Sequence, residues 1–479
     1  MRGCTCGGKV CTRTPASIPD HRSMSGSPIA GNAPAIRVYN AVTLIAVIGG
    51  LLAVVLRVYY VLHAQVLQPL DDPQVRADAA DYYRYAWNLL HHAAFANDVP
   101  ASPQLHPNSF RDPGYAVFLA GLMAATSNYA SWYAAVLLTQ ALLGGITVSL
   151  LVLAARDFLP PTALAVAALA MALWPHSVAM PSFVLSETLL SFVCALGILG
   201  VYFLLRRPTF WRLVGTGLII SGASMTNAVL LPFGVALACM LLVRRHLDGR
   251  AAATLALVSL LLPAAWGVRA FTLPPSDSSV HRAAMNLVQG SWPTYHAAYQ
   301  LAMKGDGDGI RTINAIDSEV ALFQVSTFTG LSTLANRFEH APLTYASWYA
   351  SKPALLWDWD IRIGQGDIYV YPTRNSPFRE NPAWKAVEAA CFLANPILMM
   401  LALAGTVSAV ARRESESIHV ALATMIATVT LIYSILQAEP RYSNAFRGTE
   451  ILLATIGTID IWRFLGDIRA GSRDSHSSS

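Results

Sequence analysis

Two carboxylates stand three residues apart in the stretch DAADYYRYAWNLL, at Asp78 and Asp81. A carboxylate of this kind can act as a general base, because a positioned side chain that removes a proton from a reacting hydroxyl contributes about 10²–10⁴-fold to its rate. The same residues have a simpler explanation, since the helix dipole favours negative charge in the first turn. The spacing alone leaves both interpretations open.

Other polar residues that could do chemistry lie beside long apolar runs. Glu187 occurs in SETLL, and Arg441 and Tyr442 occur in EPRYSNAFR. A guanidinium offers a planar fork of donors that suits phosphate, so Arg441 is a candidate phosphate ligand. Glu187 has a structural alternative as a helix N-terminal residue, and each arginine has one as an interfacial anchor with a snorkelling stem. The alternative phosphate ligands are Arg269, Arg111 and Arg57.

The composition indicates a membrane protein. The chain has 479 residues, of which 54% are hydrophobic and 13% charged, whereas a soluble domain carries about 25% charged residues. The net charge of +5 is modest and no basic stripe with interleaved aromatic residues occurs, which argues against a nucleic-acid partner. The six cysteines imply no disulfide framework, and no Walker, Rossmann, zinc-protease or GxSxG motif is present in the sequence.

The apolar runs predict an all-α polytopic membrane protein with about ten transmembrane helices, within a range of nine to twelve. A spanning helix needs about 20 apolar residues, and only helices or closed barrels satisfy their backbone in lipid. The pair 212–227 and 228–243 is short, and its polar SMTN stretch would also fit one broken helix. The predicted spans are 42–64, 131–155, 161–181, 184–205, 212–227, 228–243, 249–270, 386–410, 417–436 and 445–464.

Arginine clusters predict the orientation. With the N-terminus inside and ten spans, all four clusters fall on the cytoplasmic side, which is the positive-inside pattern. This requires that the short apolar segment 113–127 does not cross. Polar groups at membrane depth are costly and usually functional, so their convergence predicts an active site on the periplasmic or exterior face of a plasma (bacterial inner) membrane. The residues that converge there are Glu187, Asn227, Arg269, Arg441 and those of the two long loops.

These boundaries divide the chain into five parts. The divisions follow from hydropathy alone. The parts are a disordered cytoplasmic N-terminus (1–37), a transmembrane core with a first external loop at 65–130 (38–270), a large external loop (271–385), C-terminal transmembrane helices (386–465) and a cytoplasmic tail (466–479).

The stretch that begins at Asp78 predicts an amphipathic helix of about 15 residues. Asp78, Tyr82 and Tyr85 share one stripe by helical spacing. The helix is too polar to span, so it is expected to lie in the membrane interface with its tyrosines at headgroup depth.

The motifs, taken in order, resemble those of the GT-C glycosyltransferases, and more narrowly the bacterial glycosyltransferase family 39 type, the protein-mannosyltransferase-like and aminoarabinose-transferase-like branch. DAADYYRYAWNLL and FRDPGYAVFLAGL resemble the family's first external loop, and PSFVLSETLLSF resembles its acidic helix end. LPAAWGVRAF and EPRYSNAFRGTEILLA are similar to its Pro-Trp-x-x-Arg-Asn and Glu-x-Arg-Tyr segments. The resemblance covers about 40–465. Three positions depart from the family pattern: Ala116, Ala270 and the pair Thr226–Asn227.

The resemblance implies a hexosyl- or pentosyltransferase that takes a sugar from a polyprenyl-phosphate donor and passes it to a hydroxyl with inversion. It implies that Asp78 is the general base, with Asp81 as runner-up or as a partner that tunes it by like charge. Glu187 completes the expected catalytic set by binding a metal, pairing with an arginine or orienting the acceptor. Arg441, Tyr442 and Arg269 are the expected ligands of the donor phosphate.

The long outer loop supplies further candidates for substrate binding. Its stretch LLWDWDIRIGQGDIYVYP interleaves rings with carboxylates, which suits a sugar, although rings resting on the membrane interface would give the same pattern. No cofactor is certain, and a divalent metal ion stays open. Expected partners are the lipid-linked donor, membrane lipids and a lipid, glycan or protein acceptor. The rival hypotheses are a transporter or lipid flippase of the cell envelope and an inactive membrane scaffold. The expected substrate-binding residues are Arg111, Tyr82, Asn227, Trp357 and Asp358.

Overall fold

The computed structural model describes residues 33–72, 77–273, 278–364, 368–412 and 417–477. Helices make up nearly all of its regular structure, which confirms the predicted all-α class. The two strands among the described residues, β1 (Gln65–Val66) and β2 (Thr373–Arg374), pair antiparallel and connect the segment predicted as the first external loop to the one predicted as the long external loop. Most of the predicted disordered N-terminus, 1–32, lies outside the described residues, and α1 begins at Ala33 within its last part.

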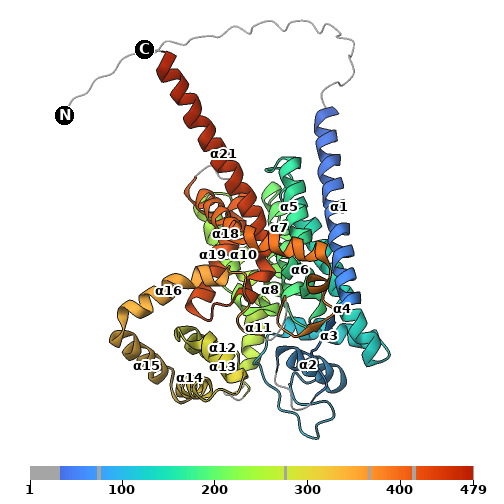
Figure 1. The fold of residues 1–479 in the computed structure, drawn as a ribbon, viewed down its shortest axis with the longest axis vertical. Helices are drawn as coiled ribbons and strands as arrows, with labels where there is room; N and C mark the ends of the chain where they lie inside the picture. Colours follow the sequence, from blue (N-terminus) through green and yellow to red (C-terminus); the bar gives the residue numbers. More distant parts are fainter. Residues whose placement is uncertain (1–32, 73–76, 274–277, 365–367, 413–416, 478–479) are drawn as a thin grey trace, which may run out of the picture.

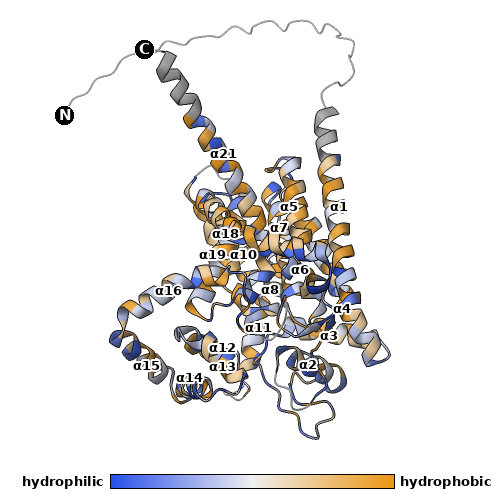
Figure 2. Cartoon of the chain, in the orientation of Figure 1, coloured by the Kyte–Doolittle hydropathy of each residue, from blue (hydrophilic) through white to orange (hydrophobic). Residues whose placement is uncertain are grey.

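Apolar helices form the upper part of the molecule in Figure 1, and Figure 2 shows that hydrophobic residues dominate their surfaces. A cluster of buried apolar side chains runs through this bundle and forms its core. The bundle helices are α1 (Ala33–His63), α4 (Tyr129–Ala154), α5 (Pro161–Leu173), α7 (Glu187–Arg206), α8 (Phe210–Thr226), α9 (Phe233–Val243), α10 (Gly249–Ser259), α11 (Leu261–Ala270), α18 (Pro382–Ala411), α19 (Ser417–Ile435) and α21 (Arg447–Ser477).

The predicted number of ten spans is not confirmed by the length and composition of the described helices. Among the described residues five helices are long and apolar enough to cross a membrane, or up to seven if two bent pairs each count as one span. The bent pairs are Pro161–Leu173 with Pro175–Ser182, at 57°, and Gly249–Ser259 with Leu261–Ala270, at 40°. The other predicted spans are helices, but α8 has 17 residues, α9 has 11, and α21 carries charges from its first residue. A bilayer-spanning helix needs about 20 predominantly apolar residues.

Small residues let the long helices approach closely. A Cβ atom on Gly145 of α4 would lie 2.8 Å from the carbonyl oxygen of Gly50 in α1, and one on Gly405 of α18 would overlap that of Leu453 in α21. Such contacts are the usual way in which helices associate in lipid. Arg57 also lies inside this packing, 3% exposed, with Nη1 donating to the Ala53 carbonyl at 3.1 Å. It is therefore a buried packing residue and not a snorkelling anchor.

The polar segments gather at the lower end of the molecule in Figure 1, opposite the free end of α21. The first external loop provides α2 (Asp78–His92) and α3 (Pro113–Ala124), and α3, with 12 residues, is too short to span. The long external loop provides α12 (Ser279–Ser291), α13 (Tyr295–Met303), α14 (Gly307–Val325), α15 (Thr327–His340) and α16 (Pro342–Leu356).

Short helical turns connect the bundle to this polar end. One of these turns, α20, carries Arg441. They are α6 (Pro175–Ala179), η1 (Met180–Ser182), η2 (Ala228–Leu230), α17 (Pro377–Glu380), α20 (Pro440–Ser443) and η4 (Asn444–Phe446).

The helix α2 has the predicted bounds, and its tyrosines are buried in protein. Tyr82 lies edge-on to Tyr115 of α3 with ring centroids 4.9 Å apart, and Tyr85 stacks on Phe95 at 4.2 Å. Such stacked and edge-to-face ring pairs stabilise the packing beyond the apolar area that they bury. The position of these rings at headgroup depth stays a prediction.

Candidate active site

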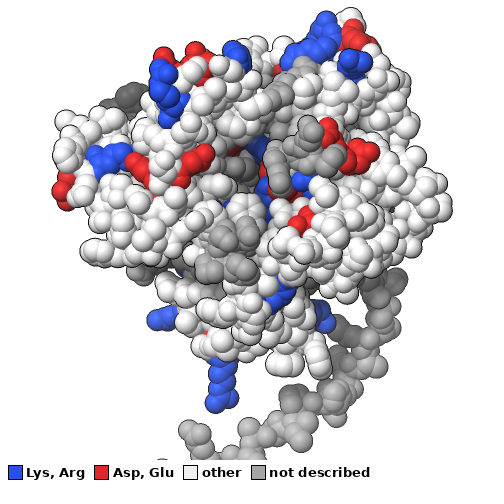
Figure 3. Space-filling view, turned by 90° about the horizontal axis from the view of Figure 1, so that it is seen from below, with Lys and Arg blue, Asp and Glu red and all other residues white. Residues whose placement is uncertain are grey.

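Four arginine–carboxylate contacts join residues from four distant segments. Arg111 Nη2 donates to Asp78 Oδ1 at 2.6 Å and to Asp81 Oδ2 at 3.1 Å. Arg441 Nη2 donates to Asp78 Oδ2 at 2.6 Å, and its Nε donates to Glu187 Oε1 at 2.7 Å. Asp78 therefore bridges two arginines, and Arg441 bridges two carboxylates. In Figure 3, charged atoms of both signs lie at the bottom of a recess in the face seen from below.

Helix ends position these side chains. Asp78 and Glu187 are the first residues of α2 and α7, where the helix dipole favours a carboxylate. Arg111 stands two residues before Pro113, the first residue of α3, and Arg441 follows Pro440, the first residue of α20. Proline is favoured at the first helical position because its fixed φ suits the helix and its missing N–H has no partner there. The sequence thus sets the first residue of each helix. The charged side chains therefore lie at or just before the helix N-termini.

The ion pairs control the protonation of the two acidic residues of α2 differently. Burial alone would raise the pKa of Asp78, but the charges and hydrogen bonds of Arg111 and Arg441 outweigh it and hold that pKa well below its usual range. Burial raises the pKa of Asp81; the charge of Arg111 opposes this rise, and the charge of Asp78 adds a smaller upward effect. Asp78 is thus held as an anion, while Asp81 binds a proton more readily.

A second ion pair beside the cluster was not predicted from the sequence. Asp112, the N-cap residue of α3, accepts a hydrogen bond from Arg282 of α12 at 2.7 Å and another from the backbone N–H of Ala228 at 3.0 Å. This pair joins both external loops to the break after α8. Asp112 stood in the quoted motif FRDPGYAVFLAGL, but nothing in the sequence around Arg282 marks it.

Several predicted residues surround the cluster without joining its ion pairs. The Tyr82 ring lies 5.6 Å from the Arg111 guanidinium, and its hydroxyl lies 3.5 Å from Ser186 Oγ. Tyr442 stacks on Tyr433 of α19 with ring centroids 4.9 Å apart. Asn227 caps η2 and donates to the Tyr433 hydroxyl at 3.3 Å. Tyr82 and Tyr442 thus lie beside the cluster, and Asn227 is connected to Tyr442 through Tyr433.

Three other predicted residues lie outside the cluster. Arg269 stacks on Trp266 at 4.6 Å and donates to the Asn108 carbonyl at 2.9 Å. Trp357 is buried, with Nε1 donating to Thr430 at 3.0 Å, and Asp358 pairs with Arg362 at 3.2 Å on the surface. The interleaved rings and acids of that stretch therefore serve core packing and a surface ion pair in this structure.

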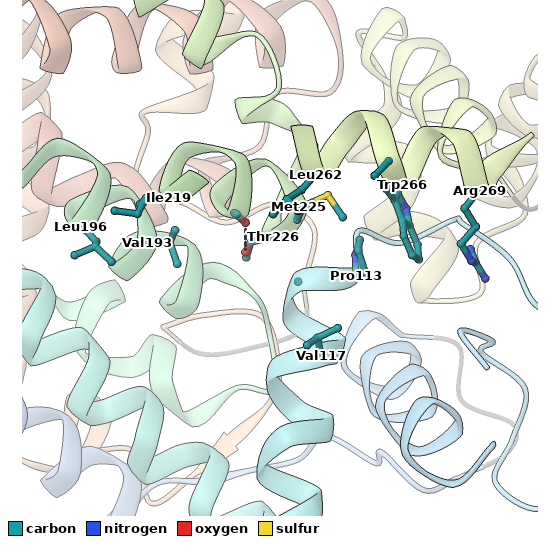
Figure 4. A pocket seen from close by; sticks show the side chains of 13 residues that line it. Pro113, Val117, Val193, Leu196, Ile219, Met225, Thr226, Leu262, Trp266 and Arg269 are labelled. Atoms are coloured by element: carbon teal, nitrogen blue, oxygen red, sulfur yellow. Dashed lines mark hydrogen bonds between the residues drawn. The ribbon is translucent and has the colours of Figure 1, made fainter. Parts of the chain in front are cut away.

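An apolar groove of about 570 Å³ runs beside the site, between α3, α7, α8 and α11. Figure 4 shows Val117, Val193 and Leu196 along it, with Trp266 and Arg269 at the end where α11 meets the first external loop. Its wall includes Pro113 and Gly114, next to Asp112 and Arg111. The groove thus offers an apolar surface that ends close to the charged cluster.

The donor set for a metal ion is limited. Within the described ranges, no group of three or more histidine, cysteine, aspartate or glutamate side chains is arranged to hold a metal. The carboxylates of the cluster are engaged by arginines instead, so the chemistry that it supports directly is binding of an anion and transfer of a proton.

No protein-family model and no curated protein matches this sequence. Among solved structures, the oligosaccharyltransferase AglB of Archaeoglobus fulgidus, in complex with an inhibitory peptide and a dolichol-phosphate, is 14% identical with a TM-score of 0.45. That alignment covers 90% of this chain and 51% of AglB, so the chain spans about half the length of the archaeal protein. ArnT from Cupriavidus metallidurans, bound to undecaprenyl phosphate, is 12% identical with a TM-score of 0.36, covering 90% and 78% of the two chains.

Proposed function

We propose that this protein is a membrane glycosyltransferase of the GT-C type that moves a sugar from a polyprenyl-phosphate donor to a hydroxyl acceptor at the outer face of the membrane. The observation that carries this proposal is the Asp78 carboxylate held between two arginines, 2.6 Å from each, beside an apolar groove. A base, cations for a leaving phosphate and a path for an apolar tail are the three parts that such a transfer needs.

The alternative of a transporter or flippase has less support. Transporters place their polar residues near the bilayer midplane, in discontinuous helices related by repeats. Here Asp78 and Glu187 are the first residues of α2 and α7, and Arg441 lies in a short turn between α19 and α21.

In the proposed reaction the donor phosphate replaces Asp78 as the hydrogen-bond partner of Arg111 and Arg441. A guanidinium binds phosphate through two parallel hydrogen bonds, so the incoming anion competes directly with the carboxylate. Once Asp78 loses these partners and gains a negative neighbour, its pKa rises from the depressed value and it becomes a stronger base. The ion pairs therefore hold the base inactive until the donor is bound.

The transfer itself is a single displacement with inversion. The acceptor oxygen forms a bond to the anomeric carbon while the bond from that carbon to the phosphate oxygen breaks, and the acceptor proton passes to Asp78. Arg111 and Arg441 stabilise the negative charge that develops on the leaving polyprenyl phosphate. Glu187 orients Arg441, and Asp81 raises the basicity of Asp78 by like charge.

The groove between α3, α7, α8 and α11 is the proposed path of the polyprenyl tail. Filling it by Gly222→Phe is expected to raise the donor KM by about tenfold, since a lost contact of about 1.4 kcal/mol changes affinity tenfold. Gly222 lines the groove, and a Cβ atom there meets nothing within 4 Å, so the new ring can enter the space without a backbone clash. The measurement is initial transfer rate against donor concentration in detergent micelles.

The matched control for this variant is Gly215→Phe. Gly215 lies two turns earlier on α8, also has open space around its Cβ position, and is not part of the groove. It should leave the donor KM unchanged. An equal effect of the two substitutions would mean that the tail does not use this groove.

The experiment that tests the proposed function is lipid and glycan extraction from cells that lack the protein. We expect one glycoconjugate to disappear and its polyprenyl-phosphate sugar to accumulate, because the donor has no other consumer at this step. Re-expression of the full chain should reverse both changes. An unchanged set of glycoconjugates, together with altered distribution of a lipid or solute across the membrane, would support the transporter instead.

A further inference from the structure

Lys352 of α16 is fully buried without an acidic partner. Its side chain is 0% exposed, and its ammonium donates to the carbonyl oxygen of Gly290 at 2.9 Å and to that of Leu436. The ring of Tyr349 lies 4.5 Å from the ammonium. Within the described part of the chain, no carboxylate forms an ion pair with Lys352. A buried charge without a counter-ion is costly, so the position needs an explanation.

The two carbonyl groups belong to the ends of two different helices. Gly290 is in the last turn of α12, and Leu436 directly follows α19. Carbonyl groups at helix C-termini lack helical partners and carry the negative end of the helix dipole, so a cation suits them. A Cβ atom on Gly290 would overlap the carbonyl oxygen of Leu436, so the contact of the two helix ends requires glycine. Lys352 of α16 therefore connects the C-terminal end of α12 to that of α19 through these two hydrogen bonds.

Leu436 begins the six-residue segment that ends at Arg441, which we call the 436–441 strap. The strap is buried: Gln437 is 3% exposed and Glu439 is 0% exposed. Glu439 Oε1 accepts the backbone N–H groups of Arg362 at 2.6 Å and Ile363 at 3.1 Å. Glu439 Oε2 also lies 3.1 Å from Nε2 of His296 in α13. The external loop thus holds the strap at its first residue through Lys352 and at its fourth through Glu439.

We propose that Lys352 is a positioning residue, which fixes the start of the 436–441 strap and thereby places Arg441 between Asp78 and Glu187. No hydrogen bond or ring contact among the described residues joins Lys352 directly to Arg441, so the effect is transmitted through the strap. The consequence for activity rests on the proposed function, because Arg441 is there a ligand of the donor phosphate. It assigns to the long external loop the task of holding the phosphate ligand in place.

The chain offers a matched set of variants. Lys352→Met keeps the length of the side chain and removes all donors, whereas Lys352→Arg keeps a charge and donors. Gly290→Ala disturbs the same contact from the other side. Lys304→Met is the control, because Lys304 is an exposed lysine of the same external loop.

Two measurements separate the positioning role from general stability. Hydrogen exchange on the purified full chain should become at least tenfold faster in the strap amides of Lys352→Met, with the core amides of α4 and α7 unchanged. In transfer assays Lys352→Met should raise the donor KM by about tenfold and leave the acceptor KM unchanged, with partial rescue by Lys352→Arg. Lys304→Met should change neither quantity.

A double-mutant cycle with Arg441→Lys completes the test. If Lys352 and Arg441 act on the same phosphate contact, the effects of their substitutions on donor affinity should not be additive. The effects of substitutions at independent sites are additive. Unchanged strap exchange in a folded Lys352→Met protein would overturn the proposal. If that variant fails to fold, the same measurements on Lys352→Gln, which keeps a hydrogen-bond donor without the charge, decide. Absence of transfer by the unaltered protein would refute the proposed function, while the exchange measurement would still test the positioning role.

Discussion

Replacing Asp78 by asparagine is expected to reduce turnover by about 10²–10⁴-fold, the usual contribution of a general base, while the protein stays folded. Asparagine keeps the shape of the side chain but cannot take a proton from the acceptor. Arg111 and Arg441 keep their contacts with Asp81 and Glu187, at 3.1 and 2.7 Å, so neither guanidinium is left alone. The donor KM should stay the same or fall, because the phosphate no longer competes with a carboxylate.

The measurements are single-turnover transfer rates and the glycoconjugate profile of cells that carry the variant, which should match that of cells without the protein. Asp157→Asn is the control, since Asp157 also pairs with an arginine, Arg206, and both side chains are partly exposed. Asp81→Asn should lower the rate by about tenfold, as expected for a residue that tunes a base by roughly one pKa unit. Normal glycoconjugates in the Asp78 variant would remove Asp78 as the base, and a larger loss at Asp81 would transfer the role to it.

The members of the charged cluster were predictable from the sequence, but their pairing was not. Glu187 and Arg441 stand out because charged residues are rare beside long apolar runs, whereas Asp78 and Arg111 were indicated by motifs that resemble those of a known family. Which arginine meets which carboxylate depends on how four helix ends are placed, and hydropathy carries no information on that. The sequence left open that Glu187 pairs with an arginine, and in the structure this arginine is Arg441, which also pairs with Asp78. Arg282 was missed because it lies in an ordinary amphipathic helix.

The fold was predictable where local pattern and burial agree. Long apolar runs such as the one in α4 gave the right helices within a few residues. The count of spans was less certain, because α8 and α9 are short helices whose apolar residues face other helices as well as lipid. The rings of α2 and of the Trp357 stretch were assigned to the interface and to substrate, since a buried ring and an interfacial ring look the same in sequence. Only packing partners distinguish the two cases.

Replacing Arg441 by glutamine is expected to have two separable effects. The side chain is 11% exposed and pairs with Asp78 and Glu187. Removing one partner of a buried ion pair typically costs about 3–5 kcal/mol of stability, because the remaining charges lose their compensation. The donor KM should also rise by about 10- to 100-fold, in line with about 1.5–3 kcal/mol for a hydrogen bond to a charged group. Thermal unfolding in detergent and transfer kinetics measure the two effects separately.

A second substitution in the same network tells whether the loss of activity follows from the loss of stability. In Arg441→Gln with Glu187→Gln, the carboxylate left unpaired by the first change is neutral, so much of the lost stability should return. The donor KM should stay high, because no cation has been restored for the phosphate. Arg206→Gln is the control for the loss of an arginine, and its half-exposed pair with Asp157 should cost no more than about 1 kcal/mol. Recovery of donor affinity together with stability in the double variant would show that Arg441 only supports the fold, and the phosphate would then need another ligand such as Arg111 or Arg282.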